Sequence, residues 1–110
     1  MMAKIGTATL IGKSGEQYEF TAYSVDSPFP NSSAVYALTR RIVENGKGRH
    51  EVVYVSDSIQ LEQSIRANTK LPDILALGAN CICVREVMGD KARRKVAADL
   101  RLCYNPPIRD

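Results

Sequence analysis

Residues that build metal and disulfide sites are scarce in this chain, which has one histidine and three cysteines. An odd number of cysteines cannot form a complete disulfide framework. Cys81 and Cys83 alternate within a strand-like segment, so both point to one face, and we expect them and Cys103 to be small hydrophobic residues of the core. The lone histidine, His50, has no cysteine or carboxylate pair near it in the sequence. No metal site and no catalytic histidine are therefore predicted.

Long hydrophobic runs and a surface charge of one sign are also missing. The apolar runs are all much shorter than the roughly 20 residues that a membrane span needs. The net charge of +3 comes from 15 basic and 12 acidic side chains, a balance too even for a dedicated nucleic-acid binder. The segment Met1–Gly6 lacks the apolar stretch of a signal peptide. We expect a cytoplasmic protein without membrane contact, forming a single domain over residues 1–110.

Alternating apolar residues and turn signals predict five strands. The first two flank Gly12–Gly15 and form an N-terminal hairpin within residues 1–25. The next two flank an Asn45-Gly46 step, which is a strong signal for a tight hairpin turn. The predicted strands are residues 4–11, 16–25, 34–43, 50–56 and 80–88.

Two short helices are predicted between the fourth and fifth strands. Capping oxygens at Ser56–Ser58 open the first, which runs to about residue 68. Its apolar stripe is expected to consist of Ile59, Leu61 and Ile65. Pro72 suits the first turn of the second helix, residues 72–77, which Gly78 ends.

A third helix begins at Gly89-Asp90 and stops before Pro106 and Pro107. The spacing of its apolar residues predicts one core face, made of Ala92, Val96, Leu100 and Cys103. The element order predicts an α+β fold, in which a small antiparallel or mixed β-sheet is flanked by helices.

Three segments of the chain resemble the skeleton of a GIY-YIG nuclease domain. They are SAVYALTRR at residues 33–41, HEVVYVSDSIQLEQSIRAN at residues 50–68 and VAADLRLCYNPP at residues 96–107. The first two contain tyrosine tripeptides, and the third ends in Tyr-Asn-Pro-Pro. The resemblance covers residues 33–109 and is to a small, stand-alone bacterial type. It implies a three-stranded sheet flanked by helices, to which residues 1–25 add an extra hairpin.

The resemblance also implies roles for individual positions. The tyrosine that helps to activate water in active members of the family matches Tyr36, and the tyrosine that supports the site matches Tyr54. The family's glycine, arginine, metal-binding glutamate and final asparagine are all replaced here, at Ser56, Ser64, Ala97 and Arg109. Without these groups a divalent cation lacks its carboxylate ligand and the phosphate lacks its planar cation. The resemblance therefore implies a vestigial site without a cofactor.

The main functional prediction is a non-catalytic module that binds nucleic acid or protein. One alternative is an active Mg²⁺-dependent endonuclease with relocated residues, for which Arg66 could replace the missing arginine. Asp99 is not expected to supply the missing carboxylate, because it lies about 200° around the helix from Ala97. A second alternative is a structural protein that self-associates through the edge of the N-terminal hairpin.

Nucleic-acid binding would use basic side chains near the second hairpin turn and on the predicted helices. The candidates are Arg40, Arg41, Lys47, Arg49, Arg66, Lys91 and Arg94. With so few phosphate contacts, binding would be weak and non-specific, with dissociation constants of about 10⁻⁴–10⁻⁶ M. The basic run at residues 91–95 is more typical of a solvated helix face than of a binding site.

Overall fold

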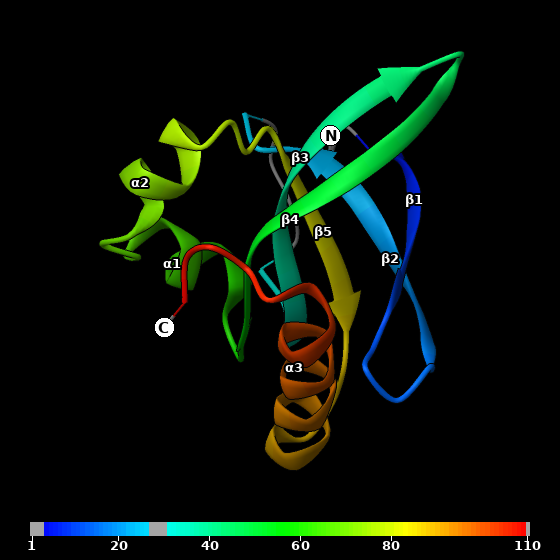
Figure 1. Cartoon of the computed structure of the whole chain (residues 1–110). Helices are drawn as coiled ribbons and strands as arrows, with labels where there is room; N and C mark the ends of the chain where they lie inside the picture. The colour runs from blue at the N-terminus through cyan, green and yellow to red at the C-terminus, as the bar shows by residue number, and fades with distance from the viewer. Residues whose placement is uncertain (1–3, 27–30, 110) are drawn as a thin grey trace.

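The computed structural model describes residues 4–26 and 31–109 of the chain (Figure 1). It confirms the α+β class and the predicted order of strands and helices. No helix in the described ranges is long and apolar enough to cross a membrane. The elements are β1 (Lys4–Ile11), β2 (Gln17–Ser24), β3 (Ala34–Glu44), β4 (Lys47–Ser58), α1 (Leu61–Arg66), α2 (Leu71–Ala76), β5 (Cys81–Glu86) and α3 (Asp90–Tyr104).

The five strands form one antiparallel sheet in the order β1-β2-β5-β3-β4. The N-terminal hairpin therefore extends the sheet beside β5. At the tip of the second hairpin, Asn45 and Gly46 have φ values of 52° and 76°. Both lie in the left-handed region, as a type I′ turn requires, so the predicted two-residue turn is confirmed. β4 is longer than predicted because pairing with β3 continues to this turn at one end and to Ser58 at the other.

The sheet separates two apolar layers. Tyr36 and Leu38 of β3 point to one face, where they pack with Leu61, Ile65 and Ile74 of α1 and α2. We call this the α1/α2 face. Val35 and Ala37, which alternate with them, point to the other face, where they pack with Phe20, Ala97 and Leu100. We call this the α3 face, because α3 covers it (Figure 1).

The first short helix begins later than predicted. Ser56–Ser58 belong to β4, and the N-cap of α1 is Gln60. Ile59 is 64% exposed, so its place in the apolar stripe was predicted wrongly. The strand outcompetes the helix here because residues up to Ser58 still pair with β3. The second helix agrees better with the sequence: its first turn contains Pro72, and Gly78 follows it with a φ of 94°.

The buried face of α3 agrees with the predicted one at Leu100, and Val96 packs beside it, but the fully buried positions also include Ala97. Ala97 and Leu100 are completely buried and Arg93 is 3% exposed, whereas Ala92 and Cys103 are exposed. The prediction of core positions for Ala92 and Cys103 was wrong. It failed because a charged side chain, Arg93, occupies the inward position at the start of the helix. The core positions predicted for the other two thiols, Cys81 and Cys83, are confirmed.

Candidate functional site

The two tyrosines of the resemblance lie in the core of the α1/α2 face. Tyr36 and Tyr54 are each 2% exposed, and their ring centroids are 6.1 Å apart with the ring planes tilted by 46°. Leu61 and Ile65 of α1 belong to the same cluster. A tyrosine buried in this way contributes mainly packing. These two side chains do not line an open cleft in the described structure.

The positions of the family's glycine and arginine are occupied by serines on the same face. Ser56 is buried, and the hydroxyl of Ser64 in α1 forms a short hydrogen bond with the hydroxyl of Ser58. The Ser58 hydroxyl also accepts a hydrogen bond from the backbone N–H of Gln60 at 2.9 Å. The hydrogen bond between these two serines links the end of β4 to the first turn of α1. Arg66 points elsewhere, since its Nε lies 3.0 Å from Glu62 on the exposed side of the helix.

Ala97, the position of the family's metal-binding glutamate, lies on the opposite face of the sheet. It is completely buried and packs in the cluster that contains Val35 and Ala37, the two neighbours of Tyr36 in β3. The sheet therefore lies between Ala97 and the tyrosine pair. Arg109 does not join them either: its Nε donates to the carbonyl of Pro106 at 3.3 Å. The structure does not bring the matched catalytic positions together.

Asp99 holds the turn of the N-terminal hairpin. Its carboxylate accepts hydrogen bonds from the Ser14 backbone at 2.9 Å, the Ser14 hydroxyl at 2.6 Å and the Tyr18 hydroxyl at 2.7 Å. Its carbonyl accepts a further bond from the backbone of Lys13 at 3.1 Å. The bonds from Ser14 and then Tyr18 lower the pKa of the Asp99 carboxyl. Sequence periodicity gave no signal for this contact, because its partners are more than 80 residues apart.

A second cluster that the sequence did not reveal joins three strands on the α3 face. Thr39 Oγ1 lies 2.8 Å from His50 Nδ1, and the sulfur of Cys83 lies 3.8 Å from the same nitrogen. A thiol beside an imidazole is the arrangement of a cysteine nucleophile. Here burial raises the pKa of Cys83 to about 12. The thiol is therefore protonated at neutral pH and chemically inert.

The lone histidine gives a pH-dependent signal that can be tested directly. Burial and then the charge of Arg41 lower the pKa of His50. We expect its ring resonances to titrate below the ordinary value of about 6.5. Because the unfolded chain takes up this proton at higher pH than the folded chain, stability is lost as the pH falls through 6.5. Nuclear magnetic resonance measures the midpoint, and the Arg41→Gln variant should raise it. A midpoint at or above the ordinary value would contradict this.

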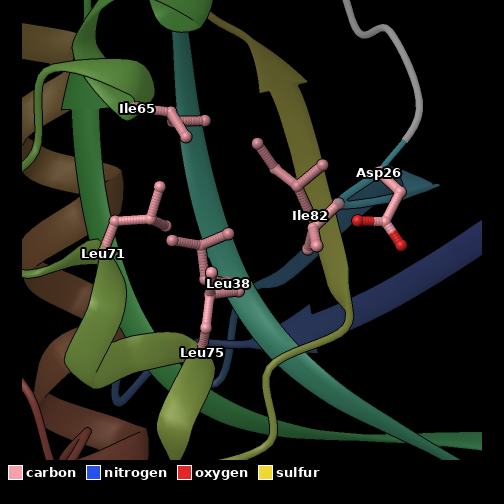
Figure 2. A pocket seen from close by; sticks show the side chains of 7 residues that line it. Asp26, Leu38, Ile65, Leu71, Leu75 and Ile82 are labelled. Carbon is pink, nitrogen blue, oxygen red and sulfur yellow. The ribbon is translucent and has the colours of Figure 1, made fainter.

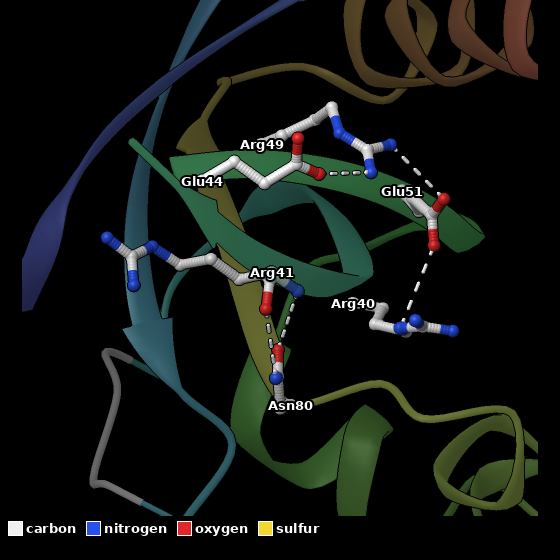
Figure 3. Close-up of polar contacts among 6 residues, drawn as sticks. All are labelled: Arg40, Arg41, Glu44, Arg49, Glu51 and Asn80. Atoms are coloured by element: carbon white, nitrogen blue, oxygen red, sulfur yellow. Dashed lines mark hydrogen bonds and ion pairs between the residues drawn. The ribbon is translucent and has the colours of Figure 1, made fainter. Parts of the chain in front are cut away.

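Several of the candidate phosphate-binding arginines are already paired with carboxylates. Arg49 lies 3.0 Å from Glu44 and 3.2 Å from Glu51, which also pairs with Arg40 at 3.7 Å (Figure 3). Such exposed pairs contribute little stability. They nevertheless place a negative charge beside each positive one, so the outer surface of the β3–β4 hairpin offers little net attraction for phosphate.

Arg41 differs from these arginines. Its backbone N–H donates to Asn80 Oδ1 at 2.8 Å, and its carbonyl accepts from Asn80 Nδ2 at 3.3 Å. Its guanidinium extends away from the two glutamates (Figure 3) and forms no ion pair within residues 4–26 and 31–109. Arg41 is therefore a cation available to a ligand.

The remaining basic candidates do not form one surface. Lys47 is exposed at the hairpin turn, and Lys91 and Arg94 are exposed on the first turns of α3. Figure 1 shows this turn and the start of α3 at opposite ends of the molecule. Arg93 is not solvated as its neighbours are: its Nε lies 3.6 Å from Asp57, and it also pairs with Asp90. One residue of the basic run at residues 91–95 therefore has a structural role, because it joins the start of α3 to β4.

The α1/α2 face contains a small apolar pocket of about 120 Å³. Figure 2 shows Leu71 and Leu75 on one side of it and Ile82 and Asp26 on the other. The pocket has no group able to polarise a phosphate. In the ranges that the structure describes, no cluster of three or more histidine, cysteine or acidic side chains could hold a metal ion.

Comparison with known proteins adds no assignment: no family model, curated protein or solved structure matches the chain.

Proposed function

We propose that this chain is a non-catalytic binding module of the GIY-YIG type and that its partner is a protein. The observation that carries the proposal is the position of Ala97, which is buried on the α3 face while Tyr36 and Tyr54 are buried on the α1/α2 face. Phosphodiester hydrolysis requires a cation, a water and a charge-stabilising group at one point in space. In this chain the corresponding positions are separated by a sheet, Ala97 supplies no carboxylate, and Ser64 supplies no guanidinium.

The choice of a protein partner rests on the charges. Arg40, Arg49 and Arg66 are each paired with a glutamate. A nucleic-acid site needs several unpaired cations on one surface. Weak nucleic-acid binding remains the second candidate function, and the observation in its favour is the unpaired guanidinium of Arg41.

The purified protein is expected not to cut DNA or RNA. Supercoiled plasmid and single-stranded RNA, incubated with the protein and Mg²⁺ or Mn²⁺, should show no nicking above the buffer control. The matched variant is Tyr36→Phe, which keeps the packing and removes the hydroxyl. Metal-dependent nicking by the natural protein that this variant abolishes would overturn the proposal and favour the active endonuclease. Tight, salt-sensitive binding of an oligonucleotide would favour the second candidate.

A further inference from the structure

The two edges of the sheet face a common groove. β1 and β4 are the outer strands, and each pairs with a single neighbour in the described structure. Residues Thr7–Leu10 of β1, residues Gly48–His50 of β4, and Tyr104 line one cavity of about 360 Å³. The sheet must therefore curl far enough to bring its two edges to opposite sides of this cavity, which we call the edge groove.

Unpaired backbone groups of β1 point into the edge groove. The N–H of Gly12 bonds across the hairpin to Glu16 at 2.9 Å, whereas the N–H of Ile11 bonds outward to the Tyr104 hydroxyl at 2.9 Å. Backbone groups in an antiparallel strand alternate in direction from residue to residue. Thr9 and Thr7, which share the direction of Ile11, therefore turn their N–H and C=O groups away from β2 and toward the groove.

The same reasoning applies to β4. Its two-residue turn closes on the pair Glu44–Lys47, which is the hydrogen-bonded pair next to such a turn. Arg49 and Glu51 consequently bond to β3, and Gly48 and His50 present their backbone groups to the edge groove. An independent observation agrees: the backbone of Arg41, the partner of His50 in the register, bonds to Asn80 on the far side of β3.

The chain itself covers parts of both edges. Tyr104 occupies the end of the groove beside Ile11, and on β4 the carbonyls of Val53 and Val55 accept bonds from Ile108 and Arg101. Among the described residues, no hydrogen bond of this kind covers the stretches beside Thr7–Thr9 and Gly48–His50. They have room for a short extended segment.

The charge at the groove indicates which segment fits. An added Cβ at Gly48 would lie 2.9 Å from the Nε of Arg41, so this unpaired guanidinium lies beside the open part of β4. A carboxylate is the natural partner of a planar guanidinium. Exposed sheet edges bind extended peptides by adding them as a strand, with backbone bonds for affinity and side chains for specificity.

We infer that the edge groove binds an extended peptide that carries a carboxylate, which pairs with β1 and β4 as an additional strand and with Arg41 through its acidic side chain. This inference rests on the proposed function, because it names the kind of protein segment that the module binds. It accounts for the exposed edges, for the free arginine and for the glycine at position 48.

The test uses the full chain and a random peptide library displayed on phage. Enriched peptides should alternate in polarity and contain Asp or Glu, and they are then measured as free peptides by calorimetry. Thr9→Pro removes an N–H that faces the groove without removing a bond to β2, and proline is tolerated on an edge strand. We expect it to weaken binding about tenfold, whereas the control Thr9→Val, which keeps the N–H, should not. Arg41→Gln should also weaken binding about tenfold.

Amide hydrogen exchange on the natural protein tests the same point without relying on a variant. A bound peptide should protect the amides of Thr7, Thr9, Gly48 and His50. The inference is overturned if no peptide is enriched, if Thr9→Pro and Arg41→Gln bind as tightly as the natural chain, or if protection falls elsewhere. It is also overturned if the groove holds a second copy, seen by ultracentrifugation as a dimer that Thr9→Pro dissociates. Plasmid nicking, by contrast, would overturn the proposed function and leave these binding results standing.

Discussion

Ala97→Glu is expected to destabilise the protein by about 4 kcal/mol or more, which is most of the stability of a small domain. Position 97 is completely buried among Phe20, Val35 and Leu100. Overfilling a packed core costs about 1–3 kcal/mol. A buried carboxyl has its pKa raised by up to about 3–5 units, at about 1.4 kcal/mol per unit. The glutamate that the resembled family uses to hold a metal is therefore expected to be incompatible with this core.

The matched control for this experiment is Ala98→Glu. Ala98 is the next residue of α3 and is exposed, so the substitution should change the free energy of unfolding by no more than about 0.5 kcal/mol. Chemical denaturation of both variants measures the difference. If Ala97→Glu were as stable as Ala98→Glu and gained affinity for Mn²⁺, position 97 would have to face a site shared with the tyrosines. That result would contradict the separation of the two faces.

Gly12→Ala is expected to cost about 1–3 kcal/mol, the usual range for overpacking. A Cβ at Gly12 would collide with the carboxylate of Asp99, with Oδ1 only 2.9 Å away. This carboxylate cannot move aside without losing its hydrogen bonds to Ser14 and Tyr18. Thermal or chemical unfolding measures the loss. Gly6→Ala in β1, the strand that ends just before Gly12, is the control, because no atom lies within 4 Å of its added Cβ.

A double-mutant cycle identifies the cause. In an Asp99→Ala background the obstacle is gone, so Gly12→Ala should cost much less than it does in the natural chain. Gly6→Ala should have the same effect in both backgrounds. If the effects of Gly12→Ala and Asp99→Ala on the free energy of unfolding were strictly additive, the glycine would be needed for another reason. That result would contradict the proposed clash between the added Cβ and the Asp99 carboxylate.

Local patterns were enough to predict the strands, the Asn45-Gly46 turn and the second short helix. Each of these depends on residues close together in the sequence, such as alternating side chains, or the proline in the first turn of α2 and the glycine that follows the helix. The continuation of β4 to Ser58 was not predicted, because it depends on contacts that are distant in the sequence. Ser56–Ser58 have the chemistry of a helix cap, but their long-range pairing with β3 decides their conformation.

The relation between the faces of the sheet could not be predicted in the same way. The alternation of side chains along β3 places Tyr36 on the opposite face of the sheet from its neighbours Val35 and Ala37. No short-range sequence pattern, however, indicates which of the two faces α3 covers. The orientation of α3 itself depends on Arg93, whose partners Asp57 and Asp90 make burial of a cation acceptable. The cluster of Thr39, His50 and Cys83 likewise requires the register of three strands, including the irregularity after Leu38.

The bond between Arg41 and Asn80 has a mechanical consequence. β3 pairs with β5 only as far as Thr39, yet it continues beside β4 to Glu44. Beyond Thr39 the two strands form a projecting ribbon. The side-chain amide of Asn80, just before β5, forms two hydrogen bonds with the backbone of Arg41 at the base of this ribbon. An isolated two-stranded ribbon is only marginally stable. The Asn80 amide lies at the base of the ribbon, where any bending of the ribbon would begin. Its two hydrogen bonds therefore limit how far the ribbon can move relative to β1.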